Sequence, residues 1–216
     1  LGVLNLEGLW TRYENPMPLY EEIAKLEKED ATRRMQEIYK APIKAELITE
    51  RLKEIRAAGV TVAGALSPAR VGEFHKAVVA GNPDLFVIRG TTVSAEHVSK
   101  DPERQPLNLK KFIREYEIPV IVGGCASYST ALHLMRTGAV GVLVGVGPGH
   151  ACTSRGVLGI GVPQATAIAD AAGARIHSNS WGCGREAEDA VTKCNVYDSM
   201  AADTDRFVWD HEDFVV

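Results

Sequence analysis

Five short apolar runs, rich in Val, Ile and Leu, alternate along the chain with longer amphipathic stretches. Each run is too short for a helix and is bounded by Gly, Pro or polar residues, which predicts strands. The predicted strands are Leu1–Leu4, Val60–Leu66, Leu85–Ile88, Pro119–Val122 and Val140–Val144. The predicted helices are Leu19–Tyr39, Ile43–Ala58, Arg70–Ala80, Leu107–Tyr116, Ser129–Thr137 and Pro163–Ala174. Apolar strands that alternate with helices indicate an α/β fold with a parallel sheet covered on both faces.

The strand count leaves two architectures open. A closed (β/α)8 barrel has eight strands over about 250 residues, whereas this chain has five recognisable strands in 216 residues. An open, doubly wound sheet also accommodates five strands. Hydrophobic periodicity does not distinguish the two.

Composition excludes several classes of function. The formal net charge of -4 gives no basic excess, so we expect no nucleic-acid partner. No apolar stretch reaches the roughly 18 residues that span a bilayer, so we expect no membrane partner. The start of the chain does not resemble a signal peptide, and 4 Cys in a chain of this length do not indicate a disulfide framework. We therefore expect a reducing, cytoplasmic location.

Charge changes abruptly near residue 176. Residues 177–216 hold nine acidic and three basic side chains, although the chain as a whole has 24 basic against 28 acidic residues. Such a shift predicts a domain boundary. We expect one unit over residues 1–176 and an acidic tail over residues 177–216.

The segment Gly145–Arg155, of sequence GVGPGHACTSR, directly follows a predicted strand. Ligands of parallel α/β folds bind at this end of the strands. Its glycines let the backbone approach a ligand closely, and Cys152 is a candidate nucleophile because loop amides can lower the pKa of a thiol. A second interpretation stays open: a tight Gly-rich turn with one buried structural Cys accounts for the same residues. The spacing lacks the third Gly of a dinucleotide-binding fingerprint.

Gly145–Arg155, together with Gly159–Ile168, resembles the active-site loop of the IMP dehydrogenase/GMP reductase superfamily. The match is most similar to the branch that lacks CBS domains. The resemblance extends back through three further segments and covers about Leu1–Ile176. These segments are Leu132–Gly138, Pro106–Lys111 and Val93–Val98, with Gly2–Asn5 at the start.

The resemblance implies a partial (β/α)8 barrel of the TIM type and a catalytic Cys152. In this family the Cys attacks C2 of the purine of IMP, hydride leaves to NAD, and the thioimidate is hydrolysed to XMP. Ser154 matches a family Thr beside the nucleophile. Gly145 and Gly147 correspond to cofactor-binding positions, and the carbonyls of Gly147, Gly149 and Cys152 correspond to ligands of a potassium ion.

Three positions depart from the family pattern. His150, next to Gly149, stands where a Ser usually holds the substrate phosphate. Cys125 stands where an Asn faces the ligands. We expect His150, Gly149 and Cys125 to be substrate-binding. Arg89-Gly90 replaces the Asp-Ser pair that contacts the nicotinamide ribose, which leaves NAD and NADP both open.

The family's later phosphate-binding segments and its Arg-Tyr flap have no counterpart in this sequence. The resemblance therefore predicts a purine-nucleotide oxidoreductase fragment with little or no IMP dehydrogenase turnover alone, from a parent that is a homotetramer. Two alternatives remain: reduction of GMP with NADPH and release of ammonia, and a catalytically silent nucleotide-binding or interaction fragment.

The tail has a second resemblance. Ala174–Gly182, with Tyr197–Ser199 and Asp205–Trp209 beyond it, is similar to a substrate-binding segment of subtilisin-like serine proteases. The catalytic motifs of that family are absent, so we expect no proteolysis. Cys183 and Cys194 have no His at zinc spacing and predict no metal site.

Overall fold

The computed structural model describes residues 2–94 and 107–171. Its five strands belong to one sheet in chain order, β1-β2-β3-β4-β5, and both β1–β2 and β4–β5 pair in parallel. This confirms the α/β fold. The strands are β1 (Leu4–Asn5), β2 (Ala63–Leu66), β3 (Leu85–Arg89), β4 (Val120–Cys125) and β5 (Gly141–Val144).

The chain divides into two compact units between Val87 and Ile88, within β3. The boundary predicted near residue 176, and the tail with its subtilisin-like segment, lie outside the described residues. Within residues 2–94 and 107–171, no helix is long and apolar enough to cross a membrane.

The first unit packs helices α3 (Ala45–Ala57) and α4 (Pro68–Ala80) against each other beside β1 and β2. The 3-10 helix η1 (Leu9–Thr11) packs on α3. Branched apolar side chains from these elements form a buried core, because each helix turns one apolar face inward. The most deeply buried members are Leu6, Ile48, Leu52, Val62 and Val71.

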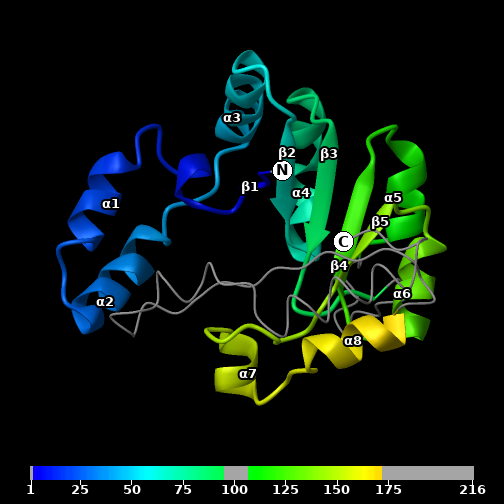
Figure 1. Cartoon of the computed structure of the whole chain (residues 1–216). Coiled ribbons are helices and arrows are strands. Elements are labelled where there is room, and N and C mark those ends of the chain that lie inside the picture. The colour runs from blue at the N-terminus through cyan, green and yellow to red at the C-terminus, as the bar shows by residue number, and fades with distance from the viewer. Residues whose placement is uncertain (1, 95–106, 172–216) are drawn as a thin grey trace, which may run out of the picture. The chain divides into compact units, whose positions relative to one another are not determined.

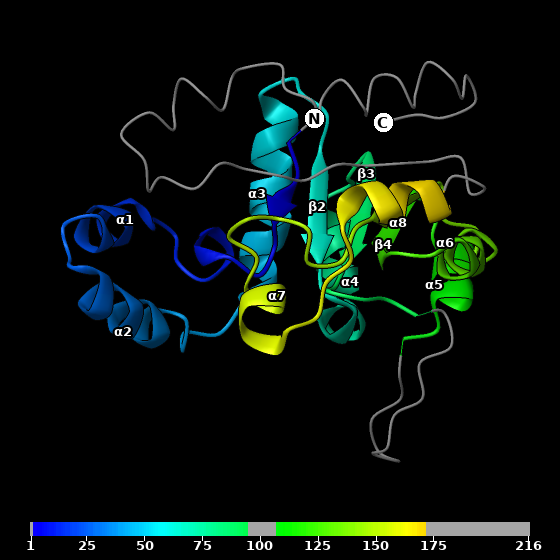
Figure 2. The same ribbon diagram turned by 60° about the horizontal axis from the view of Figure 1, so that its bottom comes forward.

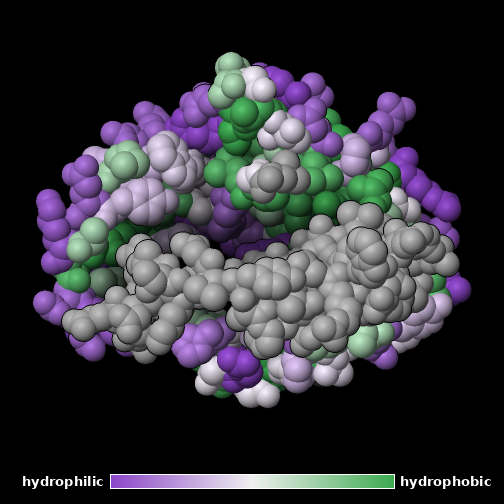
Figure 3. Space-filling view, viewed as in Figure 1, coloured by the Kyte–Doolittle hydropathy of each residue, from purple (hydrophilic) through white to green (hydrophobic). Residues whose placement is uncertain are grey.

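The single helix predicted over Leu19–Tyr39 is wrong. The structure has two helices there, α1 (Met17–Ile23) and α2 (Lys28–Ile38), and an Arg34–Glu22 ion pair of 2.6 Å joins them. Of their residues only Ile38 is buried, and hydrophilic side chains predominate over both helices in Figure 3. No continuous apolar face is therefore present to hold one long helix against a core.

In the described part of the second unit, four helices follow β3. They are α5 (Leu109–Glu115), α6 (Tyr128–Met135), α7 (Thr153–Leu158) and α8 (Gln164–Ala171). Asn108 and Ser127 cap α5 and α6 by accepting backbone N–H bonds from the first turn. The Asp170 carboxylate accepts the Tyr128 N–H at 2.8 Å, which joins α8 to α6; the two helices lie side by side in Figure 2.

Helix α7 is an element that the sequence analysis did not predict. It begins directly after Cys152 and includes Thr153–Arg155, which were expected to belong to a loop. It has six residues and none is buried, so it has no apolar periodicity that a sequence pattern could reveal. In Figure 1, α7 and α8 (yellow) follow the carboxyl end of β5.

Candidate active site

Cys152 is the N-cap residue of α7, with an extended backbone that aims the first turn of the helix at its side chain. The backbone N–H groups of Arg155 and Ser154, in the first turn of α7, lower the pKa of the Cys152 thiol, although its sulfur accepts no capping hydrogen bond. The Ser154 side chain and the Arg155 charge act in the same direction. A helix N-terminus favours an anion at this position, so Cys152 is suited to act as a thiolate.

Ser154 connects Cys152 to the end of β3. The Ser154 hydroxyl lies 3.5 Å from the hydroxyl of Thr91, which follows β3 closely in the chain. The sequence analysis did not single out Thr91. The only sequence feature that points to Thr91 is its position just after a predicted strand. The carboxyl ends of neighbouring parallel strands bring residues that are distant in sequence together.

The stem of the loop that carries Cys152 is fixed to both neighbouring segments. The Gly145 N–H donates to the Cys125 carbonyl at 2.7 Å, and the Val146 carbonyl accepts the Val162 N–H at 2.8 Å. Gly145 has a φ of 137°, which side chains of L-residues rarely adopt. A Cβ at Gly145 would lie 2.7 Å from Oε1 of Gln164. Packing therefore requires glycine here.

Cys125 behaves in the opposite way to Cys152. It is the last residue of β4, its side chain is 1% exposed, and its thiol donates weakly to the Leu143 carbonyl at 3.5 Å. Burial raises the pKa of the Cys125 thiol to about 11. The Cys125 backbone, rather than its thiol, contacts the loop.

Two other positions singled out in the sequence are exposed, whereas Gly147 in the loop is buried. His150 is exposed, and Arg89 is exposed at the end of β3. The structure thus brings Cys152, Ser154 and Thr91 together. No contact of His150 or Arg89 with Cys152 is among those of the described residues.

Two of the three carbonyls predicted to bind potassium accept hydrogen bonds. The Gly149 carbonyl accepts bonds from the Cys152 N–H at 3.2 Å and from the Arg155 guanidinium at 3.1 Å. The Cys152 carbonyl accepts the Gly156 N–H at 3.0 Å. The guanidinium disfavours a second cation at the Gly149 carbonyl, whereas the Cys152 carbonyl keeps a second lone pair, and potassium binding stays a prediction. No group of three or more His, Cys, Asp or Glu among the described residues is placed to hold a metal.

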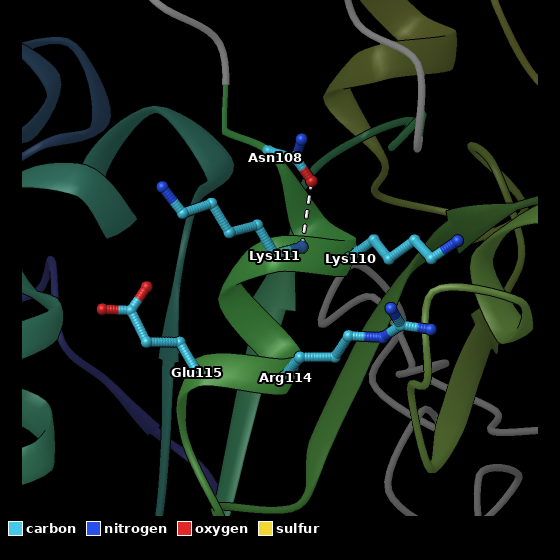
Figure 4. Close-up of a pocket in the computed structure, with 5 residues that line it drawn as sticks. All are labelled: Asn108, Lys110, Lys111, Arg114 and Glu115. Atoms are coloured by element: carbon cyan, nitrogen blue, oxygen red, sulfur yellow. Dashed lines mark hydrogen bonds between the residues drawn. The ribbon is translucent and has the colours of Figure 1, made fainter.

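A separate hollow lies over α5 and has a basic lining. Figure 4 shows that its charged side chains diverge: Lys110 and Arg114 point to one side of the helix, and Lys111 and Glu115 to the other. Asn108 completes the lining, and its side chain accepts the Lys111 N–H at 2.9 Å. Divergent cations do not form a convergent anion site.

Comparison with known proteins finds relatives over most of the chain. An uncharacterized oxidoreductase of Mycolicibacterium smegmatis is 49% identical over 181 residues, which is 81% of this chain and 48% of that protein. An inosine-5'-monophosphate dehydrogenase of Haemophilus influenzae is 33% identical over 141 residues, 65% of this chain and 27% of that protein. The chain spans about half the length of the first of these relatives.

A solved structure agrees with the fold. The IMP dehydrogenase/GMP reductase-like protein of Corynebacterium glutamicum matches with a TM-score of 0.70 and 42% identity, over 83% of this chain and 51% of that one. Residues 25–181 match the profile described as the IMP dehydrogenase / GMP reductase domain, which extends slightly past the boundary expected near residue 176. These matches cover most of the chain, which therefore belongs to the IMP dehydrogenase/GMP reductase family.

Proposed function

We propose that this chain carries the nucleophile of a purine-nucleotide oxidoreductase that oxidises IMP to XMP with NAD. The observation that supports it most strongly is Cys152 at the N-terminus of α7, with its thiol pKa lowered by the N–H groups of Arg155 and Ser154. A thiolate is the nucleophilic form of cysteine, and the first turn of α7 favours it.

In the proposed reaction the Cys152 sulfur bonds to C2 of the hypoxanthine ring. The C2–H bond breaks and its electron pair leaves with the hydrogen as hydride. Water then adds to C2 of the thioimidate, and the C2–S bond breaks to release XMP and return the thiol. The balance is IMP, NAD⁺ and water to XMP, NADH and a proton.

The donor set beside Cys152 fits a nicotinamide. The hydroxyls of Thr91 and Ser154, 3.5 Å apart, offer hydrogen bonds to an amide or ribose edge. Gly149 leaves its side of the loop open, since the nearest atom to a Cβ there would be that of Cys152 at 3.8 Å. When bound, NAD supplies the hydride acceptor. No step of the proposed reaction uses potassium.

The family resemblance leaves a second candidate function, the reduction of GMP with NADPH and release of ammonia. The predicted homotetramer and cytoplasmic location remain part of the proposal. A reducing compartment would keep Cys152 in its free form.

The test is product formation by the chain and two variants. IMP with NAD, and separately GMP with NADPH, are incubated with the unmodified chain, with Cys152→Ala and with Cys194→Ala. We expect XMP and NADH, at least one NADH per chain, from the unmodified chain and Cys194→Ala only. Ammonia from GMP instead would favour the second candidate. Equal product from Cys152→Ala would contradict both, and no product from any sample would support a silent fragment.

A further inference from the structure

Gln164 reaches from the first residue of α8 to the point where the Cys152 loop leaves the sheet. Its side-chain Nε2 donates to the carbonyl of Val144, the last residue of β5, at 3.1 Å. This bond closes a segment of 20 residues that contains the whole loop. The two ends of the loop are therefore joined by one side chain.

The same side chain packs against the peptide of Gly145. Its Oε1 lies 2.7 Å from where a Cβ of residue 145 would be, so the absence of a side chain at Gly145 makes room for the Gln164 amide. On its other side, Gly145 is held by Gly124: a Cβ at Gly124 would lie 2.5 Å from the Gly145 carbonyl oxygen. The Gly145 peptide is thus held between β4 and the Gln164 side chain.

We propose that Gln164 is a positioning residue for the Cys152 loop. It touches no reacting atom in the proposed reaction. Its amide fixes Val144 and Gly145, which determines where the loop, and with it Cys152, stands relative to the ends of the strands. The thiolate itself is stabilised locally by Ser154 and Arg155, which Gln164 does not contact in any bond of the described residues.

Loss of the Gln164 amide should therefore affect the loop stem at Gly145 and leave the Cys152 thiolate unchanged. Gln164→Met keeps the length of the side chain and loses its hydrogen bonds. The Gly145 N–H, which donates to the Cys125 carbonyl, should exchange with deuterium about three- to tenfold faster, because its peptide loses the Gln164 bond to the Val144 carbonyl; this is the factor expected for one neutral hydrogen bond. The rate of Cys152 alkylation by iodoacetamide should change less than about twofold, because α7 is unchanged. The pH midpoint of that reaction should not move.

Asp170→Ala is the matched control. It removes a hydrogen bond of similar length from the same helix, the one to the Tyr128 N–H at 2.8 Å, without touching the loop stem. If Gln164 only held α8 in place, both variants would speed exchange at Gly145 equally. If Gln164 positions the loop, exchange at Gly145 should become faster in Gln164→Met and stay unchanged in Asp170→Ala. Gln164→Glu, which places a carboxylate against the Val144 carbonyl, should exchange at least as fast as Gln164→Met.

The kinetic readout rests on the proposed function, whereas amide exchange does not. In a protein that oxidises IMP, Gln164→Met should lower kcat about 10- to 100-fold with KM changed less than threefold, since misplacement of about 1 Å has that effect. Faster exchange in a chain that forms no NADH from IMP even in a single turnover would uphold the inference and count against the function. Exchange at Gly145 equal to that of the unmodified chain, or of Asp170→Ala, would overturn the inference.

Discussion

Replacement of Gly145 by alanine should destabilise the second unit through two effects, backbone strain and contact with the Gln164 side chain. The backbone at Gly145, with its φ of 137°, is a conformation whose strain costs a side chain about 1–3 kcal/mol. The new Cβ would also meet Oε1 of Gln164 at 2.7 Å and displace the amide, at a cost of about 0.5–1.5 kcal/mol for its hydrogen bond. We expect a loss of about 2–4 kcal/mol in the free energy of unfolding.

Two nearby glycines separate the contributions. Gly159 has a φ of 66° and no atom within 4 Å of the position that a Cβ would take, so Gly159→Ala carries strain alone, up to about 1 kcal/mol. Gly156 lies inside α7 with open space around it, so Gly156→Ala should be neutral or should stabilise the helix by up to about 1 kcal/mol.

Pulse alkylation of Cys125 during heating is the assay. Cys125 is buried in β4 and reports on the second unit, because its thiol reacts only when that unit opens. For a chain of this size the expected loss lowers the temperature of half-labelling by about 5–15 °C in Gly145→Ala. In Gly159→Ala the temperature of half-labelling should fall by a few degrees or less. If Cys125 is labelled at the same temperature in Gly145→Ala and Gly159→Ala, the contact between residue 145 and Gln164 does not contribute to the loss of stability.

The titrating groups and the loop provide further tests. Iodoacetamide should label Cys152 before Cys125 at neutral pH, because the pKa of Cys152 is lowered and that of Cys125 is raised to about 11; peptide mapping that finds Cys125 labelled first would contradict the assignment. Since the pKa of Cys125 is raised from 9.0, its stabilising effect is complete below about pH 9 and is lost as pH rises towards 11, and Cys125→Ala should abolish this part of the alkaline loss in urea titrations. The Val62 N–H and the Arg56 guanidinium lower the pKa of Asp84, so its contribution is present above the ordinary value of 3.8 and disappears in acid; the stabilities of Asp84→Asn and the unmodified chain should converge as pH falls. Steady-state NADH formation by the 216-residue chain should stay well below the roughly 1–10 s⁻¹ of ordinary enzymes, because the sequence lacks counterparts of the family's later phosphate-binding segments and flap, and a value in that range would refute this expectation.

The strands were the most predictable part of the fold. The run Val140–Val144 is apolar and bounded by turn residues, and all of it but the exposed Val140 forms β5, so the existence and parallel pairing of such strands follow from pattern alone. Helix α7 and the division of Leu19–Tyr39 into two helices were not predictable, because both segments are largely exposed and carry no buried periodicity.

The candidate site, like the fold, was only partly predictable from the sequence. Cys152 was identified from its glycine-rich surroundings and from the family resemblance. The pairing of Thr91 with Ser154 and the reach of Gln164 to Val144 join residues far apart in the sequence, and only the folded chain brings them together. Such contacts leave no periodic signal along a single sequence.

The most direct test of the central claim is the chemical state of Cys152 after incubation with IMP and NAD. The chain is quenched in acid and digested, and its cysteine peptides are weighed by mass spectrometry, with Cys152→Ala as the control. The account predicts a peptide in which Cys152 carries the purine nucleotide, formed only when both IMP and NAD are present. Nucleotide found on another cysteine, or NADH produced with no modification at Cys152 at any time, would contradict the claim that Cys152 is the nucleophile.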